Sequence, residues 1–447
     1  MVRWISSDQG APKMESRHKL LVTAVLVLAS LLMVGNDLCA QGEGAIPDGT
    51  VITLQNWQNY KQYIPSGMQE FFKGTYFWKL PPDFRMIVGP THHYEPPQAF
   101  QEYTRKYSSQ VGITNTSDGR HILTGYVAGW PFPNPTDPMK GWKMLVNVWY
   151  QYYPEIFCTP HAHVRFMDRF HNVTAETFIN VYRQMDHIGD AGYPITDPQA
   201  AGTQVTEYIQ ITEPEQARYT AQLTVYYSDF AKEEDLFLFV PALRRSLRLS
   251  AAARCSPVIG SDYTQDDARP NLFNTTPARF DSTFLGDTQI LSLTKSEAKL
   301  YGNFDNYYPT VWFPKPEIGD WELRNVHVLD TRRIPSQQKG YCYGKKIMWV
   351  DAETYDTLWE DLYDDNMKLW KSAYVCPIAA VVPGEGLQGQ AWRLFSVMYD
   401  QQNAHLSMYT GGYPEVKTNR DCKDYDGEDY TNVNRYAKVS GLTEIMR

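Results

Sequence analysis

The feature that most constrains the fold of this chain is a series of three strand-like runs near its C-terminal end. The run at residues 345–350 has apolar side chains on both faces, whereas residues 355–363 and 367–374 alternate bulky and polar side chains with a period of two. Asp351 and Asp364 begin the segments between the runs, and short Asp and Asn side chains favour tight turns because they hydrogen-bond the nearby backbone. We therefore expect an antiparallel meander with at least one strongly aromatic face.

Strand-like patterns recur along much of the remaining chain. The sequence holds 31 Tyr and 12 Trp, residue types that favour strands, and its 28 Pro and 29 Gly are scattered as expected for turns between short strands. Residues 172–187 fit a helix or a strand equally well. The further predicted strands are residues 206–212, 219–228, 235–240, 244–250, 321–330, 392–399 and 405–410.

Helical periodicity stands out nearer the N-terminus. Residues 53–63 place apolar side chains at helical spacing behind Thr53 as N-cap, and a second short helix is predicted from Pro65 to Gly74. Residues 141–153 also carry Trp, Met, Leu and Val at a spacing compatible with a helix. The chain is therefore predicted to be mainly β with a few covering helices.

The first 40 residues carry the pattern of an export signal. Residues 14–19 are a short charged segment, residues 20–34 are an apolar run of 15, and Ala40 is the small residue that signal peptidases prefer. A membrane span needs about 20 apolar residues, so we expect a cleaved signal with its true start at Met14. An uncleaved membrane anchor is the alternative.

Removal of residues 1–40 leaves 38 basic and 48 acidic residues, a net charge of −10. This charge argues against a nucleic-acid partner and against binding to anionic lipid surfaces by charge alone. We expect a soluble periplasmic protein in which residues 41–115 form a helical, wrapping N-terminal segment and residues 116–447 form the main domain.

The mature chain contains five cysteines. In an oxidising periplasm this number permits two disulfides and one remaining thiol, and the spacing does not assign the partners. The five are Cys158, Cys255, Cys342, Cys376 and Cys422.

Several segments together resemble one protein family, and the resemblance runs from about Gly49 to the C-terminus. They are the Gly-Trp-Pro-Phe-Pro-Asn-Pro sequence of residues 129–135, residues 237–250, the Asp-Tyr-Thr-Gln-Asp-Asp sequence of residues 262–267, residues 321–326, and the meander. The chain is identified on these motifs as a member of the exported bacterial domain-of-unknown-function family thirteen-twenty-nine. The Cys158–His163 segment departs from the shared motifs.

This family is similar in fold to LolA and LolB, the outer-membrane lipoprotein-sorting factors. The resemblance implies a large curved antiparallel sheet, an unclosed half-barrel with helices and long loops over its concave face. It also implies a periplasmic carrier or receptor for a lipid or other hydrophobic ligand, without a cofactor. Because members are described beside exporters of the RND type and outer-membrane proteins, both are predicted partners.

The aromatic side chains of such a half-barrel are candidates to line a ligand cavity, since an open curved sheet cannot fill its own concave face. The alternative is that each is an ordinary core residue. The candidates are Trp142, Trp149, Trp349, Trp359 and Trp370.

A charged set offers a second candidate site. Arg244 and Arg248 are suited to bind the phosphate or carboxylate of a lipid headgroup, because guanidinium groups match such anions with two hydrogen bonds. The alternative is that the arginines of this strand form structural ion pairs with Asp266 and Asp267.

Two motif-like segments carry weak signals. His161 and His163 follow Cys158 at a spacing that puts both histidines on one face of a strand, which makes them weak candidates for zinc ligands. Residues 384–389 match G-x-G-x-x-G, but a strand is predicted after them where a dinucleotide site needs a helix N-terminus.

Three hypotheses follow. The first is a periplasmic carrier of a hydrophobic ligand, not an enzyme. The second is a hydrolase that uses zinc or a pair of carboxylates, and the third is an outer-membrane scaffold with an exposed apolar patch. No catalytic set can be named; the carboxylates considered are Glu353, Glu360, Asp361 and Asp364.

Overall fold

The computed structural model describes residues 46–249, 254–294, 298–382, 384–411 and 416–445. The predicted export signal lies outside these residues. Residues 48–447 form one compact unit. The predicted division at residue 115 remains a prediction.

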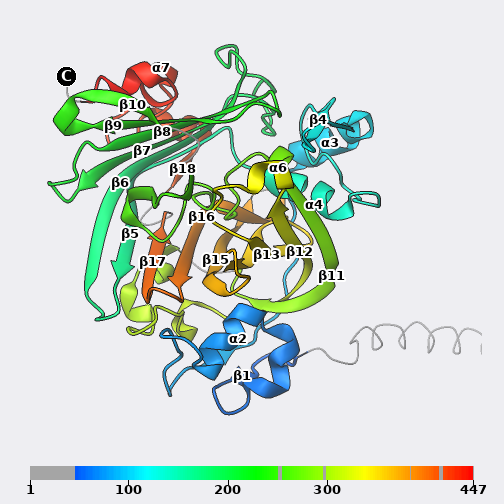
Figure 1. Cartoon of the computed structure of the whole chain (residues 1–447), viewed down its shortest axis with the longest axis vertical. Coiled ribbons are helices and arrows are strands. Elements are labelled where there is room, and N and C mark those ends of the chain that lie inside the picture. The colour runs from blue at the N-terminus through cyan, green and yellow to red at the C-terminus, as the bar shows by residue number, and fades with distance from the viewer. Residues whose placement is uncertain (1–45, 250–253, 295–297, 383, 412–415, 446–447) are drawn as a thin grey trace, which may run out of the picture. The chain divides into compact units, whose positions relative to one another are not determined.

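Fourteen strands of the described chain form a single antiparallel sheet, strongly curved in Figure 1. The path runs β10-β9-β8-β7-β6-β5-β17-β16-β15-β14-β13-β12-β11, with β18 paired to β5 beside it. Because β10 and β11 stand at the two ends of this path, the sheet does not close into a barrel, which confirms the predicted fold class. The strands are β5 (Ile156–Met167), β6 (Val173–Gln184), β7 (Thr203–Glu213), β8 (Ala221–Tyr227), β9 (Asp235–Val240), β10 (Arg245–Leu249), β11 (Phe280–Ser292), β12 (Glu322–Arg333), β13 (Lys345–Asp351), β14 (Thr357–Tyr363), β15 (Leu369–Val382), β16 (Gly386–Asp400), β17 (His405–Thr410) and β18 (Lys417–Thr418).

The predicted meander is the run β13-β14-β15. In its register Trp349 lies opposite Trp359, and Trp359 lies opposite Tyr374, so the aromatic face follows the predicted alternation. The ambiguous residues 172–187 form strand β6, which pairs with β5 on one side and β7 on the other. Pairing with two neighbouring strands therefore makes this segment a strand, although its side-chain periodicity alone fitted a helix equally well.

The predicted helices are present with shifted bounds. Helix α2 (Ser66–Lys73) ends at Gly74, whose φ of 65° suits a residue without a side chain. Helix α4 (Lys140–Trp149) ends four residues before the predicted limit. Residues 53–63 are helical only over η1 (Trp57–Tyr63), because the Asn56 carboxamide accepts the Thr53 N–H at 2.7 Å and holds a turn there.

The remaining strands and α-helices lie outside the large sheet. They are the ribbons β1 (Val51–Ile52) with β2 (Met86–Ile87) and β3 (Gly112–Asn115) with β4 (His121–Thr124), and the helices α3 (Gln98–Tyr107), α5 (Ala298–Tyr301), α6 (Pro335–Gln338), α7 (Val433–Tyr436) and α8 (Val439–Leu442).

One hydrophobic cluster contains side chains from both halves of the curved sheet, β5–β10 and β11–β17, and these side chains lie on its inner face. Phe157 and Tyr182 come from β5 and β6, whereas Met348 and Met398 come from β13 and β16. Helix α4 and residues 254–279, which connect β10 to β11, lie inside this curve and supply further members of the cluster. The concave face is thus largely filled by the chain itself.

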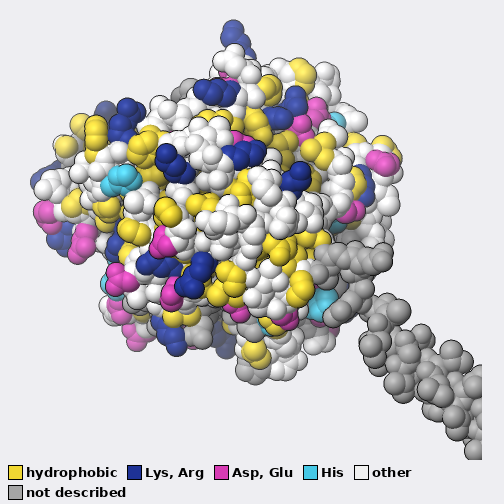
Figure 2. Space-filling view, turned by 90° about the horizontal axis from the view of Figure 1, so that it is seen from below, with side chains coloured by type: hydrophobic (Ala, Val, Ile, Leu, Met, Phe, Trp, Pro, Cys, Tyr) yellow, Lys and Arg dark blue, Asp and Glu magenta, His cyan; other side chains and the backbone are white. Residues whose placement is uncertain are grey.

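Each half of the sheet has its own cover on the outer face. The C-terminal segment packs on β5–β9, where Tyr436 stacks edge-on against Tyr208 at 5.2 Å, and the Cys158–Cys422 disulfide fastens it to β5. On the other half, α2 packs Phe71 against Tyr399 at 4.7 Å. On the face drawn in Figure 2, charged and hydrophobic side chains are interspersed, so neither kind forms a large patch there.

Candidate functional site

Two adjoining cavities lie on the inner face of the β5–β10 half of the sheet. The larger, which we call the groove, has a volume of about 320 Å³, and the smaller, which we call the chamber, has a volume of about 70 Å³. They share the lining residues Ile209, Val258 and Ile259. Small-molecule sites usually measure roughly 300–1,000 Å³, so the groove is large enough to hold a ligand.

The walls of the groove are apolar because strand alternation turns one set of aliphatic side chains inward. Leu236 and Leu238 of β9 share a face with Leu249 of β10, to which Leu236 is directly paired. Ile209 and Ile211 of β7 continue this wall, and residues 256–260 form the opposite side. The leucine side chains are half-buried, so apolar surface remains open to an occupant.

The floor of the groove is a closed polar network. The Gln222 side-chain amide donates to the Gln265 carbonyl oxygen at 3.0 Å, and the Gln265 amide donates to Thr224 Oγ1 at 3.1 Å. These bonds satisfy the amides without a ligand, so the groove presents no charged group of its own.

The chamber differs from the groove because charged side chains reach it. Phe178 and Tyr409 form apolar walls, while Asn180, Glu207 and Arg269 supply polar atoms. Burial raises the pKa of Glu207 to about 7, although the nearby Arg269 acts in the opposite direction. At neutral pH this carboxyl is therefore divided between its neutral and ionised forms.

Ile259 stands at the junction of the two cavities in a strained conformation. Its φ of 45° and ψ of 36° are in the left-handed region, which β-branched residues rarely adopt. Such backbone strain costs roughly 1–3 kcal/mol and concentrates at ligand clamps and active sites. The neighbouring turn therefore holds Ile259 against the cavities at an energetic cost.

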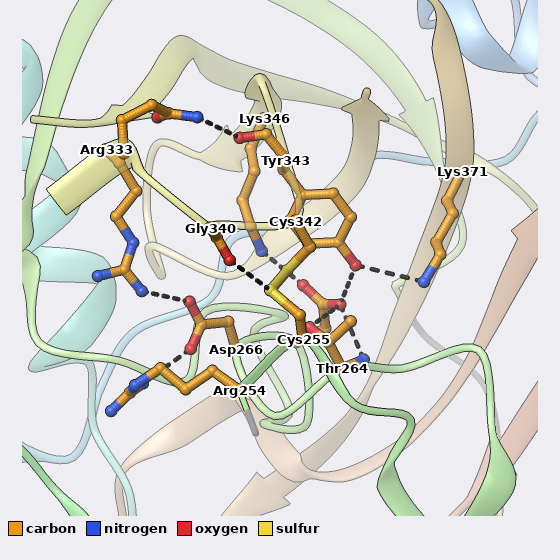
Figure 3. Close-up of a disulfide and its surroundings, with 12 residues drawn as sticks. Arg254, Cys255, Thr264, Asp266, Arg333, Gly340, Cys342, Tyr343, Lys346 and Lys371 are labelled. Carbon is orange, nitrogen blue, oxygen red and sulfur yellow. Dashed lines mark hydrogen bonds and ion pairs between the residues drawn. A yellow bond between two sulfur atoms is a disulfide. The ribbon is translucent and has the colours of Figure 1, made fainter. Parts of the chain in front are cut away.

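Residues 254–279 are held inside the sheet by a buried ion-pair network (Figure 3). Arg254 and Arg333 each donate to Asp266 at 2.8 Å, and Lys346 donates to Asp267 at 2.6 Å. Burial acts to raise the pKa of Asp266, but the two guanidinium groups outweigh it and hold the pKa well below its usual range.

A disulfide and a lysine complete this attachment. Cys255 is bonded to Cys342, and Lys371 of β15 donates to the Asp262 carbonyl at 2.6 Å. The Tyr343 hydroxyl donates to Asp267 at 2.6 Å (Figure 3). One wall of both cavities is therefore fixed by covalent and charged contacts to the far half of the sheet.

The five predicted Trp residues do not gather at one site. Trp142 donates its indole N–H to the Pro277 carbonyl at 3.1 Å, and Trp349 and Trp359 lie on the opposite face of the meander from Met348. Trp370 donates to Asp400 at 3.0 Å. None of these lines the groove or the chamber, and their ligand-binding role remains a prediction.

Trp149 contacts one of the residues that line the chamber. Its ring lies 4.1 Å from the Arg269 guanidinium carbon, a cation–π contact, and 5.3 Å from the ring of Tyr226. Trp149 thus packs against Arg269, which lines the chamber.

The predicted arginines lie away from both cavities. Arg244 is exposed at the β9–β10 turn, and Arg248 pairs with Asp235 through a 3.0 Å hydrogen bond on the outer face. Asp266 and Asp267, expected as their structural partners, instead pair with residues of β12, β13 and the segment after β10. Headgroup binding by Arg244 or Arg248 remains a prediction.

The residues considered for a metal site and for a nucleotide site form contacts within the fold. Cys158 is in a disulfide, the His161 ring bonds Asp426 at 2.9 Å, and the His163 ring bonds Thr177 at 3.1 Å. Among the described residues, no three His, Cys, Asp or Glu side chains are grouped to hold a metal ion. In the G-x-G-x-x-G match, Gly384 and Glu385 lie in the β15–β16 turn and residues 386–389 begin strand β16, so no helix follows as a dinucleotide site requires.

The carboxylates considered for hydrolysis are dispersed. Asp361 accepts hydrogen bonds from Gly67 N–H and Trp359, whereas Glu360, on the other side of β14, lies 3.4 Å from Lys346. Glu353 pairs with Arg324 at 2.7 Å. These acids hold the fold together.

Sequence reasoning missed Arg269, Glu207 and the groove itself. Glu207 stands between Val205 and Ile209, at an inward position of an otherwise apolar strand face, and this interruption is a signal that could have been noticed. Arg269 lies in an irregular segment, where no periodicity indicates direction.

Comparison with known proteins gave one family match and several structural neighbours. The family model "Protein of unknown function (DUF1329)" matches residues 51–432. No curated protein matches the chain. Within the described ranges, no helix combines the length and hydropathy that a membrane span requires.

The solved structures that resemble the chain are distant in sequence. A DUF1329 family protein from Desulfovibrio piger is 14% identical with a TM-score of 0.44, covering 66% of this chain and 98% of its own. A putative outer membrane lipoprotein-sorting protein domain from Vibrio parahaemolyticus is 13% identical with a TM-score of 0.43, covering 63% and 93%. The LolA superfamily protein NE2245 from Nitrosomonas europaea is 14% identical with a TM-score of 0.37, covering 63% and 96%.

Proposed function

This chain belongs to the DUF1329 family, described as proteins of unknown function, and from that premise we propose that it is a carrier that binds a lipid or other hydrophobic ligand in the groove. The observation that carries the proposal is the groove itself, an aliphatic hollow of about 320 Å³ inside an unclosed sheet. Half-buried leucines facing a hollow are costly to leave in water, and an apolar occupant removes that cost.

The proposed setting is the periplasm, where the protein passes its ligand between an inner-membrane exporter of the RND type and an outer-membrane protein. The apolar run of residues 20–34 and the small residue Ala40 support export. Two disulfides, Cys158–Cys422 and Cys255–Cys342, support an oxidising compartment.

We propose binding without catalysis. Among the carboxylates considered for hydrolysis, Glu353 and Glu360 form ion pairs, Asp361 anchors α2, and Asp364 accepts backbone hydrogen bonds in the β14–β15 turn. None of them lines the groove or the chamber.

The test is a charge placed in the groove. Leu238→Arg introduces a cation into the apolar wall, whereas Leu243→Arg makes the same change at the exposed β9–β10 turn. We expect the wild-type chain and Leu243→Arg to carry co-purified lipid in native mass spectrometry and to bind the neutral dye N-phenyl-1-naphthylamine. Leu238→Arg should lose both signals while its circular dichroism and melting temperature stay close to those of the control.

Equal dye binding and lipid content in the two variants would contradict a ligand site in the groove. If the wild-type chain itself carried no lipid and bound no apolar probe, the carrier function would be wrong.

A further inference from the structure

The guanidinium of Arg269 is the least satisfied buried cation beside the cavities. The residue is 6% exposed, and its Nη2 donates to the Tyr182 hydroxyl at 2.6 Å. Its Nε and Nη1 are buried without a hydrogen-bond partner in the described part of the chain. A buried donor left unpaired usually costs about 1–3 kcal/mol, and more on a charged group, so this position calls for an acceptor.

No carboxylate of the described chain forms an ion pair with Arg269. The charge of Glu207 acts on the pKa of Arg269, but the Glu207 Oε2 atom accepts a 3.4 Å hydrogen bond from the Asn274 side chain and none from Arg269. Asp267, the other acid of the chamber, is engaged by Lys346 at 2.6 Å. The positive charge of Arg269 is therefore not matched by a directly bonded anion.

Arg269 nevertheless remains charged. Burial acts to lower its pKa, but an arginine keeps its proton throughout the physiological pH range and the Glu207 carboxyl acts to raise the pKa. The cation also lies over the face of Trp149, at 4.1 Å. These contacts stabilise the charge without using the Nε and Nη1 hydrogens.

The chamber that Arg269 lines is small and opens toward an apolar space. Its volume of about 70 Å³ suits a compact polar group, since a cavity needs only roughly 10–15 Å³ to hold one water. Ile209, Val258 and Ile259 separate it from the groove and line both. A molecule with a small head and an aliphatic chain matches the two cavities in order.

We propose, building on the carrier function, that the ligand is a single-chain amphiphile whose anionic head binds Arg269 in the chamber while its aliphatic chain lies in the groove. The head is a carboxylate, as in a fatty acid, or a phosphate monoester, since both accept paired hydrogen bonds from a guanidinium group. The Arg269 guanidinium donates to the head oxygens through one of its two unpartnered nitrogens and the second hydrogen of Nη2, and Ile259 closes against the first carbons of the chain.

The first experiment uses the wild-type chain and four probes with the same 16-carbon chain. These are palmitic acid, hexadecyl phosphate, methyl palmitate and hexadecylamine, measured by displacement of N-phenyl-1-naphthylamine below their critical micelle concentrations. We expect at least one of the two anions to bind ~10-fold or more tightly than the ester, the gain of a charge-assisted hydrogen bond. The stronger anion identifies the head.

The second experiment uses Arg269→Gln and Arg269→Lys, with Arg218→Gln as a control at an exposed arginine that lines neither cavity. Arg269→Gln should lose the preference for the anion and keep its affinity for methyl palmitate. Arg269→Lys should keep part of the preference, and Arg218→Gln should keep all of it.

The outcomes separate this inference from the proposed function. If all four probes bind equally, or the amine binds best, the anionic head is wrong while the groove stands. If no probe binds, the carrier function itself is wrong. Should Arg269→Gln fail to fold, the wild-type ranking of acid against ester still decides.

Discussion

Glu207 is a single buried carboxyl whose ionisation connects the chamber to the stability of the fold. Its pKa is raised to about 7, chiefly by burial, from an unfolded value near 4.5. A raised pKa means that the folded state binds the proton more tightly than the unfolded chain. The stabilisation is therefore complete below pH 4.5 and is lost as the pH rises through 7.

Replacing Glu207 with Gln should remove this contribution. In chemical denaturation, the wild-type free energy of unfolding should fall relative to that of Glu207→Gln between pH 5 and pH 8, by about 1–3 kcal/mol. Glu215→Gln, which removes a carboxylate with a 78% exposed side chain, is the control and should leave the fall between pH 5 and pH 8 unchanged. A constant difference between wild type and Glu207→Gln over this pH range would show that Glu207 does not titrate there.

The same ionisation should control binding of an anionic amphiphile. The groups facing the Arg269 guanidinium are Glu207 of β7, Tyr182 of β6, Tyr153 and Tyr226, and Asp267 already pairs with Lys346. The tyrosines stay neutral because burial raises their pKa values. We expect the affinity for palmitic acid, followed above pH 6, to fall as Glu207 ionises and to become pH-independent in Glu207→Gln. A pH-independent wild-type affinity would contradict this.

At the scale of elements, helix α2 is docked by a carboxylate rather than by apolar contacts alone. Asp361 of β14 accepts hydrogen bonds from the Gly67 N–H at 2.7 Å and the Ser66 hydroxyl at 2.9 Å. An anion at a helix N-terminus is favoured because the first N–H groups have no partner within the helix. A Cβ on Gly67 would lie 1.8 Å from an Asp361 oxygen, so the close approach requires glycine.

Gly67→Ala should therefore destabilise the protein by about 1–3 kcal/mol, even though alanine has the higher helix propensity. Lys73→Ala on the exposed side of the same helix should change stability by less than about 0.5 kcal/mol. Urea denaturation measures both. If Gly67→Ala were as stable as the wild type, the Asp361 anchor would not be required for docking.

At the scale of the whole molecule, the two disulfides act on different faces of one sheet. Cys158–Cys422 fastens the C-terminal cover to the outer face, and its cysteines are 264 positions apart in the sequence. Cys255–Cys342 fastens the start of residues 254–279, which form one wall of the cavities, and spans 87 residues. Loss of either should lower stability, commonly by about 2–5 kcal/mol.

Only the inner disulfide should affect the ligand site. We expect Cys255→Ser with Cys342→Ser to weaken binding of N-phenyl-1-naphthylamine several-fold, because the wall carrying Val258 and Ile259 loses its attachment. Cys158→Ser with Cys422→Ser should lower the melting temperature and leave dye affinity at the wild-type value. Equal effects of both pairs on binding would show that the cavities depend on global stability alone.

Local sequence patterns determined much of the architecture. Apolar side chains on both faces predicted β13, alternation predicted β14 and β15, and Gly74 marked the end of α2. Strand faces and left-handed helix ends are properties of a few consecutive residues. The five cysteines limited the disulfides to two, which is the number found.

Tertiary structure alone decided where the cavities lie. The groove combines β7, β9 and β10 with residues 256–260, and Arg269 becomes a chamber residue only because residues 254–279 turn back inside the sheet. The five Trp residues predicted to line a ligand cavity pack in or against the core on the two faces of the sheet, and none of them lines the groove or the chamber. A hollow is a property of several segments meeting incompletely, and no local pattern records what a distant segment leaves unfilled.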